Sequence, residues 1–210
     1  MAIEIELKAH VEKPDECAAA LSGIAEFLFE FKKDDTYWKM KNTNAQNTAQ
    51  VPDVRIRKEY TKNKTGEKRF VLVTYKTKNI VNGIEVNNEK EFALCDVEVD
   101  NAAAGSAVQS FEELLSRFGL APSISKNKNG RAWNYNGITA ELSLVQDLGW
   151  FVELEIISDS NDGGTVARSK ERLLHLLHKL NIGDDAIEPR YYTEMLISLD
   201  NKKNGKNEKL

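Results

Sequence analysis

The segment Ile3-Glu4-Ile5-Glu6-Leu7-Lys8, near the start of the chain, alternates strictly between apolar and charged side chains. Successive side chains of a β-strand point to opposite faces, so this alternation predicts a strand with one apolar and one charged face. The charged face carries two neighbouring carboxylates followed by a lysine. Like charges recur at the same spacing further along the chain.

Several other predicted strands carry pairs of like charge two residues apart, namely Arg55 and Arg57, Glu89 and Glu91, and Glu153 and Glu155. Side chains at i and i+2 on one strand face lie about 7 Å apart. At that distance like charges repel by roughly 0.6 kcal/mol in water, and by more where water is excluded. A single pair of this kind is typical of a solvated strand face, but its repetition indicates shared counter-ions.

These pairs predict a site that holds a cation and a polyanion together. Carboxylate pairs suit a hard divalent cation such as Mg²⁺ or Mn²⁺, whereas clustered arginine and lysine side chains suit a polyphosphate. The charged strand faces must converge for such a site to form, and a sheet curled into a barrel makes them converge.

The remaining pattern predicts a single α+β domain over residues 1–199, built on a mainly antiparallel sheet. Helical spacing of apolar residues indicates helices over residues 14–31, 100–118, 165–180 and 189–199, and the strands alternate with them. Residues 200–210 are rich in Asn and Lys with one apolar residue, so we expect a disordered polar tail.

Composition excludes several classes of protein. The chain has 210 residues, a net charge of −4 and 29 basic against 33 acidic side chains, so a general nucleic-acid binder is not expected. No apolar run approaches the ~20 residues of a membrane span, and no secretory leader is visible. Two cysteines form neither a disulfide framework nor a zinc motif. We therefore expect a soluble, cytoplasmic protein, with a homodimer as one open alternative.

The segment Glu4-Ile-Glu6-Leu-Lys8 resembles the E-x-E-x-K signature of the CYTH, or triphosphate tunnel metalloenzyme, superfamily. The resemblance continues through Val54-Arg-Ile-Arg57, Thr74-Tyr-Lys76, Glu89-Lys-Glu91, the stretch from Leu148 to Glu155, and Tyr191-Tyr192. It implies an eight-stranded antiparallel closed β-barrel, the triphosphate tunnel, with flanking helices. It also implies Mg²⁺ or Mn²⁺ as cofactor and a small-molecule triphosphate as ligand: ATP, tripolyphosphate or thiamine triphosphate.

The resemblance also implies residue roles. The metal ligands, or their close support, would be Glu4, Glu6, Glu153 and Glu155, with Glu89 and Glu91 as a supporting acidic pair. The triphosphate would be bound by Lys8, Arg55, Arg57 and Lys76, together with Lys128 or Arg131. The residues expected to be catalytic are Lys8, Lys76 and Glu141.

Three positions depart from the family pattern. Gly130 occupies or displaces an arginine, and a bulge at Asn129-Gly130 would change which residue supplies the charge. Ser143 replaces an aspartate, which Glu141 on the same face partly compensates. Asn87 replaces the arginine that commonly precedes the mid-chain glutamate pair.

The resemblance favours a class IV adenylyl cyclase-like enzyme, which converts ATP to cyclic AMP and pyrophosphate. A tripolyphosphatase or thiamine triphosphatase is the first alternative, because the same residues serve hydrolysis. A non-catalytic triphosphate-binding module is the second, since Gly130 and Ser143 stand at positions where the family carries charge.

Overall fold

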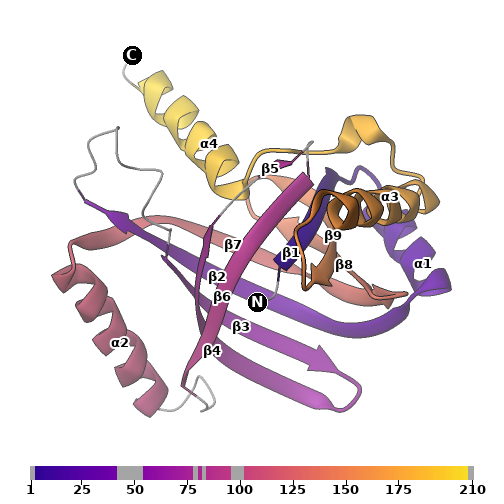
Figure 1. The fold of residues 1–210 in the computed structure, drawn as a ribbon. Helices are drawn as coiled ribbons and strands as arrows, with labels where there is room; N and C mark the ends of the chain where they lie inside the picture. The colour runs from indigo at the N-terminus through magenta and orange to yellow at the C-terminus, as the bar shows by residue number, and fades with distance from the viewer. Residues whose placement is uncertain (1–2, 42–53, 78–79, 82–83, 96–101, 208–210) are drawn as a thin grey trace.

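The computed structural model describes residues 3–41, 54–77, 80–81, 84–95 and 102–207 (Figure 1). Its strands are β1 (Ile3–His10), β2 (Glu26–Met40), β3 (Val54–Asn63), β4 (Gly66–Thr77), β5 (Ile80–Val81), β6 (Ile84–Cys95), β7 (Leu120–Tyr135), β8 (Ile138–Val145) and β9 (Gly149–Ser158). Its helices are α1 (Pro14–Ile24), α2 (Ala102–Arg117), α3 (Gly163–Lys179) and α4 (Tyr192–Asn207), with a short 3-10 turn at Asp184–Ala186.

The strands pair in a ring. The neighbours run in the order β1-β9-β8-β7-β2-β3-β4-β6, and β6 then pairs back onto β1. Each of these pairings is antiparallel, and the two-residue strand β5 pairs with β6 beside the ring. The predicted α+β fold, with eight antiparallel strands in a ring and flanking helices, is confirmed.

The helix predicted over residues 14–31 is wrong in its second half. α1 ends at Ile24, and residues from Glu26 onward belong to the long strand β2. Phe27 and Phe31 satisfy helical spacing, but Phe27, Phe29 and Phe31 also alternate, and pairing with β7 favours the extended form. A register shift between Phe27 and Phe29 marks the irregular start of the strand.

α4 corrects the expectation of a disordered tail over residues 200–210. The helix continues through residues 200–207 to Asn207, and residues 208–210 lie outside the described part. Lys203 Nζ lies 3.4 Å from Asp147 Oδ1 in the β8–β9 turn, so the polar residues are anchored by an ion pair rather than by an apolar face. None of the helices in the described ranges is long and apolar enough to cross a membrane.

Most of the buried apolar side chains face outward from the ring and are covered by helices. The main core joins the outer faces of β1, β8 and β9 to α1 and α3, through residues such as Leu7, Leu154 and Leu173. A smaller core lies between α2 and the opposite part of the sheet, around Trp38 and Leu115. In Figure 1, α1 and α3 lie together on one side and α2 on the other. The inner face of the ring is thereby left to the charged side chains.

Candidate functional site

A cavity of about 150 Å³ lies inside the ring. Among the described residues, its lining includes six cationic side chains, those of Lys8, Lys33, Arg55, Arg57, Lys126 and Lys128. The same lining carries seven carboxylates, those of Glu4, Glu6, Glu85, Glu89, Glu141, Glu153 and Glu155. The convergence expected from the charged strand faces is therefore present.

Strand alternation explains why these side chains meet. On β1, Glu4, Glu6 and Lys8 point into the cavity, while Ile5 and Leu7 point into the helix-covered core. The same period of two directs one charged face of each neighbouring strand inward. Because the sheet closes on itself, residues more than 100 positions apart in sequence face one another across the cavity.

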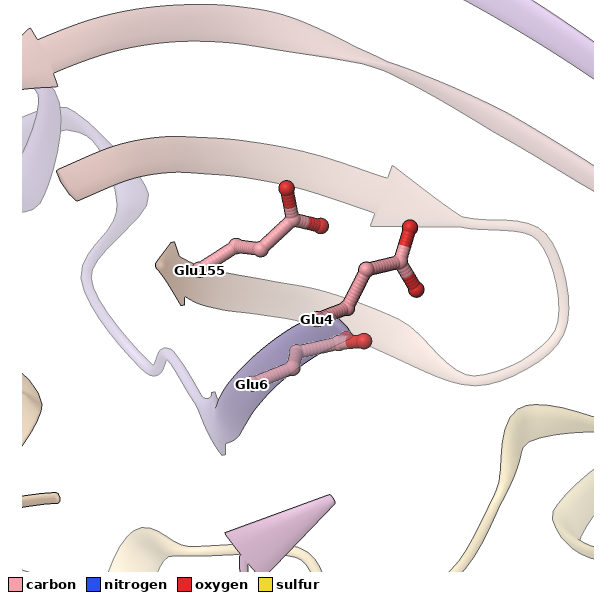
Figure 2. A group of neighbouring side chains, drawn as sticks. All are labelled: Glu4, Glu6 and Glu155. Carbon is pink, nitrogen blue, oxygen red and sulfur yellow. The ribbon is translucent and has the colours of Figure 1, made fainter. Parts of the chain in front are cut away.

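Three carboxylates form a compact acidic group at one side of the cavity. Each of Glu4, Glu6 and Glu155 offers an oxygen, and these oxygens all lie within 4.8 Å of one another. Glu6 and Glu155 are directly paired across β1 and β9, and Figure 2 shows the three side chains gathered beside these strands. Burial, followed by the negative charges of Glu4 and Glu6, raises the pKa of Glu155 to about 8.

The acidic group fits a hard divalent cation. Mg²⁺ binds carboxylate oxygens at about 2.1 Å, so two oxygens on one ion lie up to ~4.2 Å apart. The separations in this group are close to that limit, and the donors are oxygen atoms alone. Burial is the largest cause of the raised pKa of Glu155, and the negative charges of Glu4 and Glu6 add to it, so a bound cation would lower this pKa.

Glu153, also expected to be a metal ligand, has other partners. Its two oxygens lie 2.6 and 2.7 Å from Lys128 Nζ, and one of them accepts a hydrogen bond from the Tyr192 hydroxyl at 2.6 Å. It lies outside the group formed by Glu4, Glu6 and Glu155. The structure thus places three of the four predicted metal ligands together and holds the fourth in an ion pair.

Glu141 is held between two lysines. Its oxygens lie 2.6 Å from Lys33 Nζ and 2.8 Å from Lys128 Nζ. Burial alone would raise the pKa of Glu141, but Lys128 and Lys33 outweigh it and lower the pKa well below its usual range. A carboxylate with so low a pKa is a weak proton acceptor near neutral pH. Glu141 thus lies at the cavity in contact with two lysines, and its catalytic role stays a prediction.

Asp35 organises a second part of the cationic wall. It receives two hydrogen bonds from Arg57, at 2.7 and 3.0 Å, and its Oδ2 lies 3.1 Å from Lys126 Nζ. Burial would raise the pKa of Asp35, but Arg57 and Lys126 lower it far below its usual value. Asp35 is thus an ionised counter-charge that fixes the direction of two cavity cations.

Arg55 and Lys8 have their own acidic partners. Arg55 donates to Thr74 at 2.9 Å and lies 3.2 and 3.4 Å from Glu89 and Glu91. Lys8 pairs with Glu85, and its ammonium lies 5.6 and 5.4 Å from the ring centres of Tyr191 and Tyr192. The N-terminal end of α4 therefore contributes to one wall of the cavity.

Two predicted site residues, Arg131 and Glu91, lie outside the cavity lining among the described residues. Arg131 lies outside the lining, and its guanidinium lies 5.6 Å from the ring centre of Trp133 on the outer side of β7. Glu91 contacts Arg55 and Thr74 at the margin. The backbone of Lys76 pairs with Glu89 on β6, but the Lys76 side chain lies outside the described residues.

Gly130 is in regular register with Ser143, so the bulge considered at Asn129-Gly130 is absent from this described strand pair. A Cβ atom at position 130 would lie 2.7 Å from Ser143 Cβ and 2.8 Å from Phe31 Cζ, and would also collide with the Leu142 carbonyl. Glycine is required there because the Leu142 carbonyl, the Ser143 side chain and Phe31 together fill the space. Lys126 and Lys128, which precede it on the inner face, carry the charge.

Four residues at the cavity, Lys33, Asp35, Tyr37 and Glu85, are not predicted from the sequence pattern. The run Lys32-Lys33-Asp34-Asp35 places charge on both faces of β2, which hides the alternation. Glu85 has no like-charged neighbour two residues away, because Gly83 and Asn87 occupy those positions. The available signal was the spacing Lys33, Asp35 and Tyr37, which is that of a strand with one polar face.

Solved structures of low sequence identity share this fold. The PH1819 protein of Pyrococcus horikoshii OT3 is 24% identical with a TM-score of 0.74, over 93% of this chain and 98% of its own. A candidate adenylate cyclase from Vibrio parahaemolyticus is 19% identical with a TM-score of 0.68, over 92% and 97%. HpAC1 from Hippeastrum, a candidate adenylyl cyclase described with a dominant triphosphatase activity, is 14% identical with a TM-score of 0.59, over 94% of both chains. At these identities the likeness concerns the fold alone.

No match to the chain is found among the curated proteins. The family model of the CYTH domain matches residues 2–192. This span includes every strand of the ring and reaches Tyr192, the first residue of α4.

Proposed function

The chain belongs to the CYTH domain family, and on that premise we propose that it is a divalent-metal-dependent enzyme acting on a triphosphate. One observation carries the proposal: a group of three carboxylates and a wall of six cations line the same cavity. A metal triphosphate complex presents the complementary charges, with a divalent cation beside a chain of anionic oxygens.

The cationic side chains would bind and orient the phosphate chain. Arg57 has five N–H donors in a fixed fork, and Asp35 uses two of its nitrogen atoms, so further donors remain for phosphate oxygens. Glu141 forms ion pairs with Lys33 and Lys128, and Glu85 forms one with Lys8. These ion pairs hold each ammonium group in position before the phosphate chain binds. Preorganised charge of this kind stabilises negative charge that develops during phosphoryl transfer.

Glu4, Glu6 and Glu155 would hold the divalent cation. When bound, such a cation neutralises charge on the phosphate oxygens and helps to orient them. Glu153 would act differently, because its contacts with Lys128 and Tyr192 fix one wall of the cavity.

We propose ATP cyclisation as the leading reaction, in line with the resemblance to class IV adenylyl cyclases. The ribose 3′-hydroxyl oxygen attacks the α-phosphorus and releases its proton to solvent, the bond from that phosphorus to the bridging oxygen breaks, and pyrophosphate leaves. Hydrolysis of tripolyphosphate or another triphosphate is the second candidate. The cavity size favours it, because about 150 Å³ is smaller than the roughly 300–1,000 Å³ of sites that enclose whole organic ligands.

A product assay tests these candidates. The purified protein is incubated with Mg²⁺ or Mn²⁺ and with ATP, tripolyphosphate or thiamine triphosphate, and cyclic AMP, pyrophosphate and phosphate are measured. Cyclic AMP with pyrophosphate supports cyclisation, and phosphate alone supports hydrolysis. Metal-dependent tripolyphosphate binding without any product would support the non-catalytic module instead. Absence of both binding and turnover would contradict the proposed site.

Matched variants assign the observed activity to the cavity. We expect Glu6→Gln to reduce metal-dependent turnover by about 100-fold or more, as removal of a metal ligand does. Glu12→Gln, an exposed carboxylate just beyond β1, is the control and should retain the parent rate. Equal rates for the two variants would show that the activity arises elsewhere.

A further inference from the structure

Asn87 is a buried amide on the inner face of the ring that the proposed chemistry does not use. It lies on β6 between Glu85 and Glu89, which both line the cavity. Residues two apart on a strand share a face, whereas Ile84 and Val86 belong to the outer core. Asn87 is 0% exposed, so its polar atoms need partners inside the protein.

The orientation of the amide follows from its neighbour. Asn87 Nδ2 lies 3.2 Å from Glu85 Oε2, and the other oxygen of Glu85 pairs with Lys8. An ionised carboxylate accepts hydrogen bonds but donates none, so the nitrogen rather than the oxygen of Asn87 must face Glu85. The carbonyl oxygen Oδ1 is consequently turned away from Glu85.

Within the part of the chain that the structure describes, Asn87 Oδ1 is buried and accepts no hydrogen bond. Buried polar atoms without partners are rare in native proteins, and each requires an explanation. A carbonyl oxygen can be satisfied by a hydrogen-bond donor or by a cation.

The strand register places Asn87 next to Glu4, a member of the acidic group. Asn87 is directly opposite Glu4 across the β1–β6 pair, and Glu85 is opposite Glu6. Side chains opposite one another in an antiparallel pair have Cβ atoms about 4.5–5.5 Å apart. The Asn87 side chain therefore begins beside Glu4, one of the three clustered carboxylates. A cation bound by these carboxylates would satisfy the unpartnered carbonyl oxygen.

We propose that Asn87 supplies a neutral oxygen ligand to the divalent cation held by Glu4, Glu6 and Glu155. The inference rests on the metal site of the proposed function and adds to it a fourth ligand residue, on a third strand, β6. Amide carbonyl oxygens are ordinary ligands of hard cations. A neutral ligand at this position completes the coordination without adding a fourth negative charge.

Metal titration without any triphosphate tests the inference. Mn²⁺ binding to the parent protein and to Asn87→Leu is measured by calorimetry and by the loss of the free-ion signal in electron paramagnetic resonance. We expect Asn87→Leu to weaken Mn²⁺ binding by about 10- to 100-fold. Asn127→Leu is the control, because Asn127 is exposed on β7 and its amide bonds Gln146; it should retain the parent affinity.

Asn87→Asp keeps the oxygen ligand and makes it anionic, so we expect it to bind Mn²⁺ more tightly than the parent does. If Asn87→Leu does not fold, the Mn²⁺ affinity of Asn87→Asp tests whether residue 87 is a metal ligand. Unchanged Mn²⁺ affinity in a folded Asn87→Leu protein, or no gain in Asn87→Asp, would overturn the inference and indicate that a water molecule satisfies the carbonyl. A parent protein that binds no Mn²⁺ would overturn the proposed metal site itself.

Discussion

At the scale of single residues, the cavity is defined by which carboxylate each cation contacts. Asp35 holds Arg57 and Lys126, whereas Glu141 holds Lys33 and Lys128. Burying an ion pair gains little stability in itself, but removing one partner leaves an uncompensated buried charge. Substituting one of these carboxylates should therefore lower the free energy of unfolding by an amount that depends on which buried cations it contacts.

We expect Asp35→Asn to lower the free energy of unfolding by about 3–5 kcal/mol, because two buried cations lose their shared counter-charge. Asp34→Asn is the matched control, since Asp34 is the adjacent aspartate on the exposed face of β2. It should change stability by less than about 0.5 kcal/mol. Urea denaturation followed by circular dichroism gives both values. Similar effects from the two substitutions would contradict the counter-charge role.

The acidic group should make the metal-free protein sensitive to pH. The pKa of Glu155 is about 8 in the folded protein and lies near its ordinary value of 4.5 when unfolded. The folded state therefore binds the extra proton, and stability falls as the pH rises from about 4.5 to 8. The fall is at most about 5 kcal/mol.

Chelator-treated protein unfolded in urea at pH 6 and pH 9 tests this expectation. Glu155→Gln removes the titrating group and should flatten the difference between the two pH values. A parent protein that is more stable at pH 9 than at pH 6 would show that the three carboxylates do not repel one another as described.

At the scale of elements, the close packing of β2 against β7 depends on the absence of a side chain at Gly130. Phe31 on β2 occupies the space beside Gly130, and Gly130 is paired with Ser143 on β8. The phenyl ring also lies 4.4 Å from Lys33 Nζ and 5.5 Å from Lys128 Nζ, measured to the ring centre. The departure from the family pattern at position 130 is thus coupled to an aromatic residue inside the ring.

We expect Gly130→Ala to destabilise the protein by about 1–3 kcal/mol, because its Cβ would collide with Phe31, Ser143 and the Leu142 carbonyl. The same substitution at Gly105, which lies in α2 with open space around it, should stabilise by about 0.4–1 kcal/mol. Thermal unfolding of both variants measures the contrast. A neutral Gly130→Ala would mean that Phe31 moves aside at no cost.

At the scale of the whole molecule, the charges of the cavity nearly cancel, as those of the chain do. Among the described side chains of the lining, seven carboxylates stand against six cations. Such a cavity does not attract a polyanion by net charge alone. A bound divalent cation would reverse the balance beside the acidic group.

We therefore expect tripolyphosphate affinity to fall by at least about tenfold when Mg²⁺ is removed by a chelator, a change of ~1.4 kcal/mol. Calorimetry with and without Mg²⁺ measures it, and Glu4→Gln should bind tripolyphosphate weakly in both conditions. Tripolyphosphate binding that is equally tight without metal would contradict a joint site for cation and polyanion.

Much of the fold could be predicted from local pattern. The alternation in β1 and the like-charge pairs at Arg55 and Arg57 indicated strands with charged faces, and these faces line the cavity. The boundary between α1 and β2 could not be predicted, because Phe27 and Phe31 fit the helical spacing while Phe27, Phe29 and Phe31 also fit the alternation of a strand. Lys33 and Asp35 were missed for the same reason: charges occupy both faces of β2, so spacing alone does not say which face is inside.

The sequence by itself determined that charged faces exist, which residues share each face, and that the faces carry acidic and basic pairs. Only the tertiary structure decided the partners, because ring closure through β1 and β6 brings residues from distant strands together. The pairing of β1 with β9 places Glu155 beside Glu6 and Glu4, whereas Glu153 binds Lys128 of β7. The two glutamates are two residues apart on one strand, and their different roles follow from contacts across the cavity.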